Sequence, residues 1–341
     1  MYKVRTQDSV GKILIHDVTK IVADGEILEK YPVFRKNHVI REEDIEVLLS
    51  IGKEYIYAGD IDPGMVHEND AALMMGKMCE NDYLEHTGVS EGRVDIVAQK
   101  AGLLKINTDK LYEINSVENF IISTLRNNST VVSGQKIAGM KIIPLMIEAE
   151  KVEYVKNIQR GAPLMTLKPY VKTKAGLVIT GSEIYHGRRK DAFTPIIESK
   201  LEEFDADLIG TRIADDDEDM IAEYIELFLE EGAEIVFCTG GMSVDPDDKT
   251  PLAIRKVADA VVSQGAPVVP GAMWMLAYKG EIPIMGVPGG AIFSKRTTVD
   301  IILPRLMAND RVTRRDIVEL SHGGYCLKCK VCHFPNCRFG N

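Results

Sequence analysis

From residue 176 onward, short unbroken apolar runs alternate with amphipathic stripes. The unbroken runs predict buried strands at Gly176–Thr180, Glu234–Cys238 and Ile282–Val287, and Asp207–Ile213 is predicted as a further strand. The stripes recur every three to four residues and predict helices at Thr194–Phe204, Asp217–Glu231 and Ile292–Met307. Strands that are apolar on both faces and alternate with helices indicate an α/β fold, a doubly wound and mostly parallel sheet. Trp274 and its neighbouring methionines are interpreted as packing for the helix that crosses the sheet edge.

The pattern before residue 170 is less regular. Helical periodicity predicts helices at Glu42–Ser50 and Glu68–Cys79, whereas residues 92–150 favour β structure with one helix at Val117–Asn127. The basic stretch Lys168–Lys174 contains a proline and is interpreted as a linker. We therefore expect four regions. They are an α+β region at 1–70, a β-rich middle domain with linker at 71–170, the α/β domain at 174–310, and a cysteine-rich metal-binding tail at 322–341.

Composition narrows the class of protein. The 341 residues are 45% hydrophobic and 27% charged, which is typical of globular proteins. The net charge of −10 argues against a general nucleic-acid or anionic-membrane binder, because no basic excess exists to meet phosphates. The longest apolar runs, such as Lys141–Ile147, are too short to cross a bilayer, and the first residues do not read as a signal peptide. We expect a cytoplasmic location.

Glycine-containing loops follow three of the predicted strands. They are Thr180-Gly-Ser-Glu-Ile184, Thr239-Gly-Gly-Met-Ser243 and Val287-Pro-Gly-Gly290. In a parallel sheet, ligands collect at the carboxyl ends of the strands. Glycine lets a backbone approach a ligand, and free amides at a following helix start favour an anion. One such loop is more often simple turn chemistry, but three on one edge predict a ligand site.

These loops carry a resemblance to a known family. Residues 176 to about 310 resemble the molybdopterin-binding domain of molybdenum-cofactor biosynthesis proteins, namely molybdenumtransferases, gephyrin and molybdopterin adenylyltransferases. The resemblance rests on Thr180–Ile184 with Gly187 and Asp191, on Thr239–Ser243 with Asp248, Thr250 and Pro251, and on Val269–Gly271 and Gly286–Gly289. The opening Val10–Asp17 is similar to the start of the molybdenumtransferase arm.

The resemblance implies a molybdopterin site at this edge. The family's cofactor-binding positions correspond to Thr180, Gly181, Glu183, Thr239, Gly240, Gly241, Ser243, Pro288 and Gly289. The turn at Thr239–Ser243 would take the terminal phosphate on its amides. Asp191 and Asp248 would be catalytic, either holding Mg²⁺ or positioning the molybdate or phosphoryl group being transferred. The partner would be molybdopterin or adenylylated molybdopterin, with molybdate or a nucleotide as co-substrate. A homo-oligomer is also implied, because family pockets are commonly completed across subunits.

Simpler roles exist for each of these acids. Asp248 is equally interpreted as a helix N-cap, and Asp191 as a solvated turn residue. The run Asp215–Asp217 precedes a helix and is interpreted as a cap and dipole complement, with Asp216 as a further site candidate. The loop Pro288-Gly-Gly-Ala291 departs from the Pro-Gly-Asn-Pro of molybdenumtransferases, and Asp245 stands where they usually have glycine.

Three functions fit these observations. The first is an enzyme that inserts molybdate into molybdopterin or otherwise activates it. The second is a non-catalytic binder or sensor of molybdopterin with a metal-cysteine tail. The third is a nucleotide pyrophosphatase of the competence-damage-inducible type, whose domain shares this fold.

Four cysteines lie close together near residue 330. Cys326, Cys329, Cys332 and Cys337 follow the last predicted helix and the flexible stretch His322–Gly324. Three cysteines at three-residue spacing in a cytosolic chain predict a metal site rather than disulfides. Three thiolates within seven residues resemble the wrap around a [4Fe–4S] cluster. A single Zn²⁺ could take the same four thiolates, with His333 as a substitute ligand, and would make the tail a structural or docking element.

Overall fold

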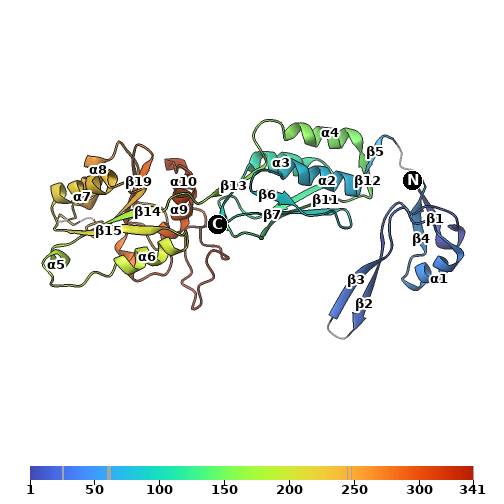
Figure 1. Ribbon diagram of the computed structural model, residues 1–341, viewed down its shortest axis with the longest axis horizontal. Coiled ribbons are helices and arrows are strands. Elements are labelled where there is room, and N and C mark those ends of the chain that lie inside the picture. The colour runs from blue at the N-terminus through green and yellow to red at the C-terminus, as the bar shows by residue number, and fades with distance from the viewer. Residues whose placement is uncertain (25–26, 60–62, 244, 247, 341) are drawn as a thin grey trace. The chain divides into compact units, whose positions relative to one another are not determined.

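The computed structural model describes residues 1–24, 27–59, 63–243, 245–246 and 248–340. The chain folds into two compact units (Figure 1). The first comprises Met1–Gln99, Ile106–Leu125 and Gly134–Thr166, and the second comprises Lys100–Lys105, Arg126–Ser133 and Leu167–Asn341. Within the described residues, no helix is long and apolar enough to cross a membrane.

The first unit opens with two antiparallel strand pairs. Strand β1 (Tyr2–Arg5) pairs with β4 (Tyr55–Ala58), and β2 (Val18–Asp24) pairs with β3 (Ile27–Phe34). The short 3₁₀ helix η1 (Thr6–Asp8) follows β1, and α1 (Glu42–Ser50) forms where its amphipathic pattern predicts a helix. A small core holds this part together and consists of Leu14, Val18, Ile40, Leu48 and Ile56.

The rest of the first unit packs helices with an antiparallel sheet of order β6-β7-β11-β9. The strands are β6 (Leu84–His86), β7 (Arg93–Ala98), β9 (Phe120–Thr124) and β11 (Lys136–Ile142). The strand β5 (Met65–His67) pairs with β12 (Met146–Glu148). The helices are α2 (Glu68–Cys79), α3 (Thr108–Ser116) and α4 (Ala149–Ile158). A three-stranded sheet, most of whose residues belong to the second unit, has the order β10-β8-β13 and consists of β8 (Gly102–Ile106), β10 (Thr130–Val131) and β13 (Met165–Pro169).

The predicted helix at Val117–Asn127 is wrong, because Phe120–Thr124 forms β9. Phe120 and Ile122 are buried whereas Ile121 and Ser123 are exposed, which is the alternation of a half-buried strand. The strand hydrogen-bonds to β11 along its whole length. The linker expected at Lys168–Lys174 is shorter than predicted, since β13 extends to Pro169 and the next strand begins at Lys174.

The second unit is built on a six-stranded sheet of order β15-β14-β16-β19-β18-β17. The strands are β14 (Lys174–Thr180), β15 (Asp207–Ala214), β16 (Ile235–Thr239), β17 (Ala260–Gln264), β18 (Met275–Lys279) and β19 (Ile282–Val287). The first four strands in the sheet are mutually parallel, β18 pairs antiparallel with β19, and β17 pairs antiparallel with β18. The predicted α/β fold is therefore confirmed.

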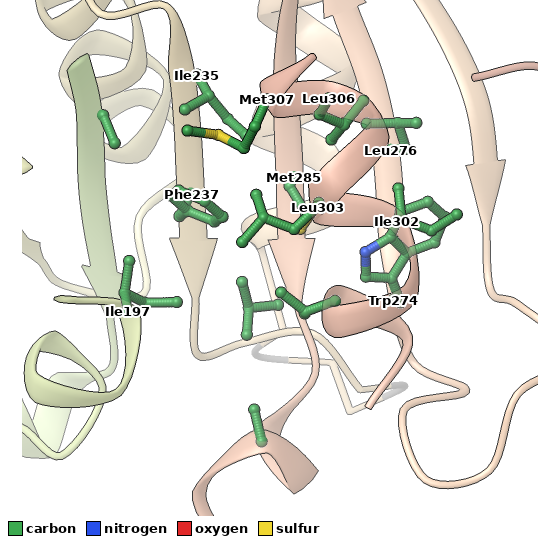
Figure 2. Packing of buried hydrophobic residues seen from close by; sticks show 14 of the residues in the cluster. Ile197, Ile235, Phe237, Trp274, Leu276, Met285, Ile302, Leu303, Leu306 and Met307 are labelled. Atoms are coloured by element: carbon green, nitrogen blue, oxygen red, sulfur yellow. The ribbon is translucent and has the colours of Figure 1, made fainter. Parts of the chain in front are cut away.

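Alternate residues of the strands pack against helices on opposite faces of the sheet. Leu177 and Phe237 belong to one core with Ile197 and Ile302, whereas Val178 belongs to a second core on the other face. Figure 2 shows the first of these cores. The helices are α5 (Ser182–Tyr185), α6 (Thr194–Glu202), α7 (Glu218–Glu230), α8 (Thr250–Val257), η2 (Gly289–Ile292), α9 (Thr298–Met307) and α10 (Arg314–Glu319).

Trp274 directly precedes β18 and is fully buried in the first core, together with Ile302 and Leu303 of α9 (Figure 2). One sequence prediction fails in the second unit. The predicted helix Ile292–Met307 is divided, with η2 ending at Ile292 and α9 beginning at Thr298. The Thr297 hydroxyl and the Asp300 carboxylate form a capping box, which stops α9 from extending towards its N-terminus. Residues 293–296 are thereby left as a loop.

The cysteine-rich segment packs against the second unit. The Cys326 amide donates to the Val269 carbonyl at 2.8 Å, and the Val269 amide donates to the Gly324 carbonyl at 2.8 Å. Phe339 is buried in the first core. Gly324 was expected to be flexible, but a Cβ atom there would lie 2.4 Å from the Leu320 carbonyl oxygen. This glycine therefore permits a close approach of two backbone segments.

Candidate functional site

The carboxyl ends of β14 and β16 open onto a cavity of about 210 Å³, called the ligand cavity below. Seven of its lining residues were singled out from the sequence: Thr180, Gly181, Glu183, Asp216, Gly240, Gly241 and Asp248. Six were not: Ile184, Arg189, Lys190, Ala192, Phe193 and Ile292. The loops after two neighbouring parallel strands thus meet at one edge of the sheet, as the strand order requires.

Buried threonines fix the strand ends that carry these loops. The Thr180 hydroxyl donates to the Thr239 carbonyl at 3.1 Å and lies 2.9 Å from the Thr250 hydroxyl. These contacts connect the ends of β14 and β16 to the start of α8. The Thr239 hydroxyl is itself buried and has no hydrogen-bond partner among the described residues. Thr239 is not one of the residues that line the ligand cavity.

The glycine turn after β16 has a conformation that other residues rarely adopt. Gly240 and Gly241 have φ values of 81° and 51°. A Cβ atom at Gly240 would lie 2.0 Å from the Thr180 carbonyl oxygen, so this glycine is also needed for packing. The amides of Gly240 and Gly241 donate no hydrogen bond to any described residue. They are therefore available to an anion in the ligand cavity.

Two basic side chains, from Arg189 and Lys190, line the same cavity. The Arg189 amide donates to the Glu183 carbonyl at 2.9 Å, which folds this loop back onto α5. Sequence reasoning missed both residues. The available signal was the cationic run Arg188-Arg189-Lys190 between the first strand and Asp191. Together with the free glycine amides, these cations give one side of the cavity the character of an anion site.

Asp248 lies at the ligand cavity and does not cap α8. Its carboxylate accepts a hydrogen bond from the Asp245 amide at 2.9 Å. The N-cap of α8 is Lys249, which makes no side-chain capping bond. The helix-cap interpretation of Asp248 is therefore wrong, and the carboxylate instead closes its own loop while it lines the cavity. Val244 and Asp247 of this loop lie outside the described residues.

Asp191 has both carboxylate oxygens bound to backbone amides. One accepts from the Phe193 amide at 2.7 Å and the other from the Thr194 amide at 3.1 Å. These bonds stabilise the start of α6, so Asp191 is not simply a solvated turn residue. The lining of the ligand cavity includes its neighbours Lys190 and Ala192 but not Asp191 itself. The catalytic role of Asp191 stays a prediction.

The remaining predicted cofactor-binding residues also lie outside the lining. They are Ser243, Pro288 and Gly289, and the last loop reaches the cavity through Ile292 instead. Their roles stay predictions.

The acidic run before α7 has divided roles. Asp217 accepts from the Met220 amide at 2.8 Å and caps α7, as its position before the helix predicts. Asp216 accepts from the Ser182 amide at 3.0 Å and lines the ligand cavity.

The pKa of Asp215 is held below its usual value, first by the Asp216 amide and then by Ser182 and His186. His186 Nε2 lies 3.3 Å from the Asp215 carboxylate, so this histidine contacts an acid rather than forming a triad.

The acids of the ligand cavity do not form a complete metal cage. Among the described residues, no group of three or more His, Cys, Asp or Glu side chains is arranged to hold one ion. Mg²⁺ is commonly bound by one or two carboxylates plus substrate phosphates and waters. Asp216 and Asp248 can therefore contribute to such a site only together with a phosphate-bearing ligand.

At one edge of the parallel sheet, glycine amides that donate to no described residue lie beside basic side chains, an arrangement that suits a small anionic ligand. Residues 176–308 match the protein family described as "Probable molybdopterin binding domain". The resemblance of this part of the chain to the molybdopterin-binding domain family, seen in the sequence, is confirmed. Residues 3–60 match a second family, described as "Domain of unknown function (DUF8806)". The similarity of that region to the molybdenumtransferase arm stays a prediction.

Individual relatives cover only parts of the chain. A CinA-like protein of Sulfurihydrogenibium sp. is 32% identical over 106 residues, which are 31% of this chain and 25% of the relative. The chain thus spans about a quarter of the length of this curated relative. The structure of the molybdopterin biosynthesis enzyme MoaB from Thermus thermophilus has a TM-score of 0.36 at 20% identity and covers 41% of this chain and 98% of MoaB. The molybdopterin biosynthesis Mog protein from Mycobacterium ulcerans has a TM-score of 0.36 at 18% identity, covering 41% and 99%. At this level of similarity neither structure identifies an activity.

Proposed function

We propose that the chain binds molybdopterin in the ligand cavity and acts in molybdenum-cofactor biosynthesis. One observation carries the proposal: Gly240 and Gly241, whose amides donate to no described residue, line the same cavity as the cations Arg189 and Lys190, within a region that matches the molybdopterin-binding family. Small-molecule pockets usually have volumes of roughly 300–1,000 Å³. The cavity of about 210 Å³ is smaller, so it takes the phosphate end of the ligand while the pterin extends outside it.

The acids of the cavity have a separate task in this proposal. Asp248 and Asp216 are acidic, whereas Arg189 and Lys190 are basic. All four residues line the cavity. A phosphate bound at the glycine turn would bring its oxygens near these carboxylates. A Mg²⁺ ion could then be held between phosphate and carboxylate and would act as a Lewis acid on the group being transferred. Asp248 thereby positions the molybdate or phosphoryl group, and the protein is an enzyme rather than only a binder.

Two alternatives share the same phosphate site. A non-catalytic molybdopterin binder would use Gly240, Gly241, Arg189 and Lys190 but would not need Asp248. The sequence match to CinA-like proteins favours a further candidate, a nucleotide pyrophosphatase of the competence-damage-inducible type. Homo-oligomerisation, with residues 1–170 of one subunit closing on the pocket of another, stays a prediction under each of them.

The phosphate site is tested by removing its cations. We expect Arg189→Gln and Lys190→Gln each to weaken molybdopterin binding by about tenfold or more, because a charge-assisted hydrogen bond contributes about 1.5–3 kcal/mol. Arg188→Gln is the matched control, since Arg188 adjoins these residues but does not line the cavity. Affinity is measured by anaerobic fluorescence titration with molybdopterin, and with ATP in parallel. Equal affinity of the wild-type protein and both variants would place the phosphate elsewhere, and tight binding of ATP alone would favour the pyrophosphatase.

The enzyme and the binder are separated at Asp248. We expect Asp248→Asn to keep molybdopterin affinity within about tenfold and to lose turnover, because the carboxylate acts on the cation or the transferred group rather than on ground-state binding. Asparagine keeps an oxygen that can accept the Asp245 amide, so the loop is preserved. Asp245→Asn is the control, as Asp245 does not line the cavity. Turnover is followed as magnesium-dependent molybdate insertion or adenylylation. Wild-type protein that binds molybdopterin but supports neither reaction would favour the binder.

A further inference from the structure

A second cavity of the same unit is lined by all four cysteines of the segment after α10. Its volume is about 450 Å³, and it is called the cysteine cavity below. The thiols that line it are Cys326, Cys329, Cys332 and Cys337. The two remaining cysteines of the chain, Cys79 and Cys238, are buried and do not line this cavity. Residues spread over twelve positions thus present their sulfur-bearing side chains to one space.

The cysteine segment is held in place by the domain around it. The backbone bonds of Val269 with Gly324 and Cys326 attach its start to the stretch before β18, and the Gly340 amide donates to the Gly323 carbonyl at 3.0 Å. Phe334 and Cys337 pack against the first core, and Phe339 is buried in it. Both ends of the segment are therefore fixed, so that the thiols line a wall of defined shape instead of extending freely into solvent.

The cavity wall has the charge that a thiolate-bound centre requires. Four of its lining residues are cationic: Lys295, Arg296, Lys328 and Arg338. No Asp or Glu occurs among the described residues that line it. Arg296 already pairs with Glu203 at 2.8 Å and Asp300 at 2.9 Å, so its charge is partly compensated. The other three cations face a space without acidic residues, and such a space favours the net negative charge of a metal centre with four thiolates.

The size of the cavity favours a cluster over a single ion. Four thiolates around Zn²⁺ each lie about 2.3 Å from the metal, which brings their sulfurs within about 4 Å of one another. Among the described residues, no group of three or more His, Cys, Asp or Glu side chains is arranged to hold one ion. The four cysteines are among the residues that line a cavity of about 450 Å³, which is much larger than one ion. A cube of four irons and four sulfides fits within such a volume and takes one thiolate at each iron.

We propose that the four cysteines of this cavity hold one [4Fe–4S] cluster. The sequence order agrees with this arrangement, because the first three cysteines are separated by two residues each. The fourth returns to the cavity after Phe334, whose ring lies 5.1 Å from the Arg296 guanidinium. The site is independent of the molybdopterin proposal, since none of its lining residues lines the ligand cavity.

The full chain tests this proposal directly. Protein prepared anaerobically and reconstituted with ferrous iron and sulfide should contain about four irons and four sulfides per chain and absorb broadly in the visible range. Reduction with dithionite should bleach this absorption and produce an EPR signal. We expect Cys329→Ser and Cys332→Ser each to lose most of the iron and sulfide. Both side chains are exposed, so these substitutions should leave the circular dichroism spectrum unchanged.

Cys79→Ala is the matched control because it removes a thiol outside the cavity. It should retain the iron, the sulfide and the visible absorption of the wild-type protein. Colourless wild-type protein with about one zinc per chain would overturn the cluster and establish a zinc site instead. Iron that binds without sulfide, or that is retained equally by Cys329→Ser and Cys332→Ser, would overturn the proposal as adventitious metal binding.

Discussion

The two cavities of the second unit are built from different parts of the chain. The ligand cavity depends on backbone: its central turn consists of two glycines with positive φ, held against the end of β14. The cysteine cavity depends on side chains: its distinguishing groups are four thiols on a segment with little regular secondary structure. A backbone site is therefore coupled to the fold of the sheet, whereas a thiol site can be lost without damage to the sheet.

This difference makes the two sites separable by experiment. Substitutions at the glycine turn should lower stability and ligand affinity together. Substitutions of exposed cysteines should remove the metal and leave stability nearly constant. The following predictions test that distinction, beginning with the largest expected effect.

Gly240→Ala should destabilise the protein by about 2–5 kcal/mol. The positive φ costs about 1–2 kcal/mol for a residue with a Cβ atom, and the overlap with the Thr180 carbonyl adds about 1–3 kcal/mol. Gly232→Ala is the control, because Gly232 has a φ of 85° but no atom within 4 Å of its added Cβ. We expect the control to lose only the conformational cost. Urea unfolding followed by the fluorescence of Trp274 measures both, and equal losses would show that close packing at the turn is unimportant.

A substitution at Asp310 tests whether a loss of stability alone changes metal or ligand binding in the two cavities, because Asp310 lines neither of them. Its carboxylate lies 2.7 Å from Arg305 Nε, 2.7 Å from Lys168 Nζ and 2.9 Å from Lys105 Nζ. We expect Asp310→Asn to cost about 2 kcal/mol, below the ~3–5 kcal/mol of a fully buried pair because both lysines are partly exposed. Iron content and ligand affinity of the folded variant should remain those of the wild-type protein. A loss of either would mean that the cavities respond to general destabilisation.

The Asp310 cluster also predicts a dependence on pH. Burial alone would raise the pKa of Asp310, but Lys168, Lys105 and Arg305 outweigh it and hold the pKa well below the usual 3.8. At a pH between the folded-state pKa of Asp310 and its usual 3.8, the Asp310 carboxylate binds a proton in the unfolded chain but not in the folded chain. The stabilisation is therefore fully present above pH 3.8 and is lost as the pH falls towards the folded-state pKa. The difference in unfolding free energy between wild type and Asp310→Asn should shrink over that range, and a constant difference would contradict this account.

The smallest effect is expected at the rim of the cysteine cavity. Lys328 lines the cavity and Lys330 does not. Lys328→Gln should make the cluster's reduction potential more negative, because reduction adds negative charge that the lysine no longer offsets. Lys330→Gln should shift the potential less. Potentiometric titration of the two variants measures this, and equal shifts would indicate a general charge effect instead of a local one.

The regular elements could largely be predicted from the sequence. The helices α1 and α2 have the predicted bounds, Glu42–Ser50 and Glu68–Cys79, because their apolar positions recur every three to four residues without interruption. The strand β9 was missed because Val117, Phe120, Ile121 and Leu125 also fit helical spacing. Which period applies is decided by the hydrogen bonds of β9 to β11, a partner distant in sequence.

The candidate site likewise contains residues whose positions could be predicted from the sequence and residues whose positions could not. Loops that follow parallel strands meet by topology, so the positions of Thr180, Gly240 and Asp248 follow from strand order alone. The basic side chains of Arg189 and Lys190 could not be placed, because the path of a loop depends on contacts such as that between the Arg189 amide and the Glu183 carbonyl. In the same way, the loop at residues 293–296 arises from one capping box at Thr297, which an amphipathic pattern does not reveal.

That loop connects the two cavities. Ile292 lines the ligand cavity, and the next four residues, Phe293 to Arg296, line the cysteine cavity. Suppose that occupancy of one cavity changes the preferred conformation of this shared stretch and so changes the binding constant of the other by some factor. Thermodynamic linkage then requires the reverse effect to have the same factor, where tenfold corresponds to about 1.4 kcal/mol of coupling free energy. A ligand at the strand ends would alter how tightly the thiols retain their metal by the same amount that the metal alters ligand affinity.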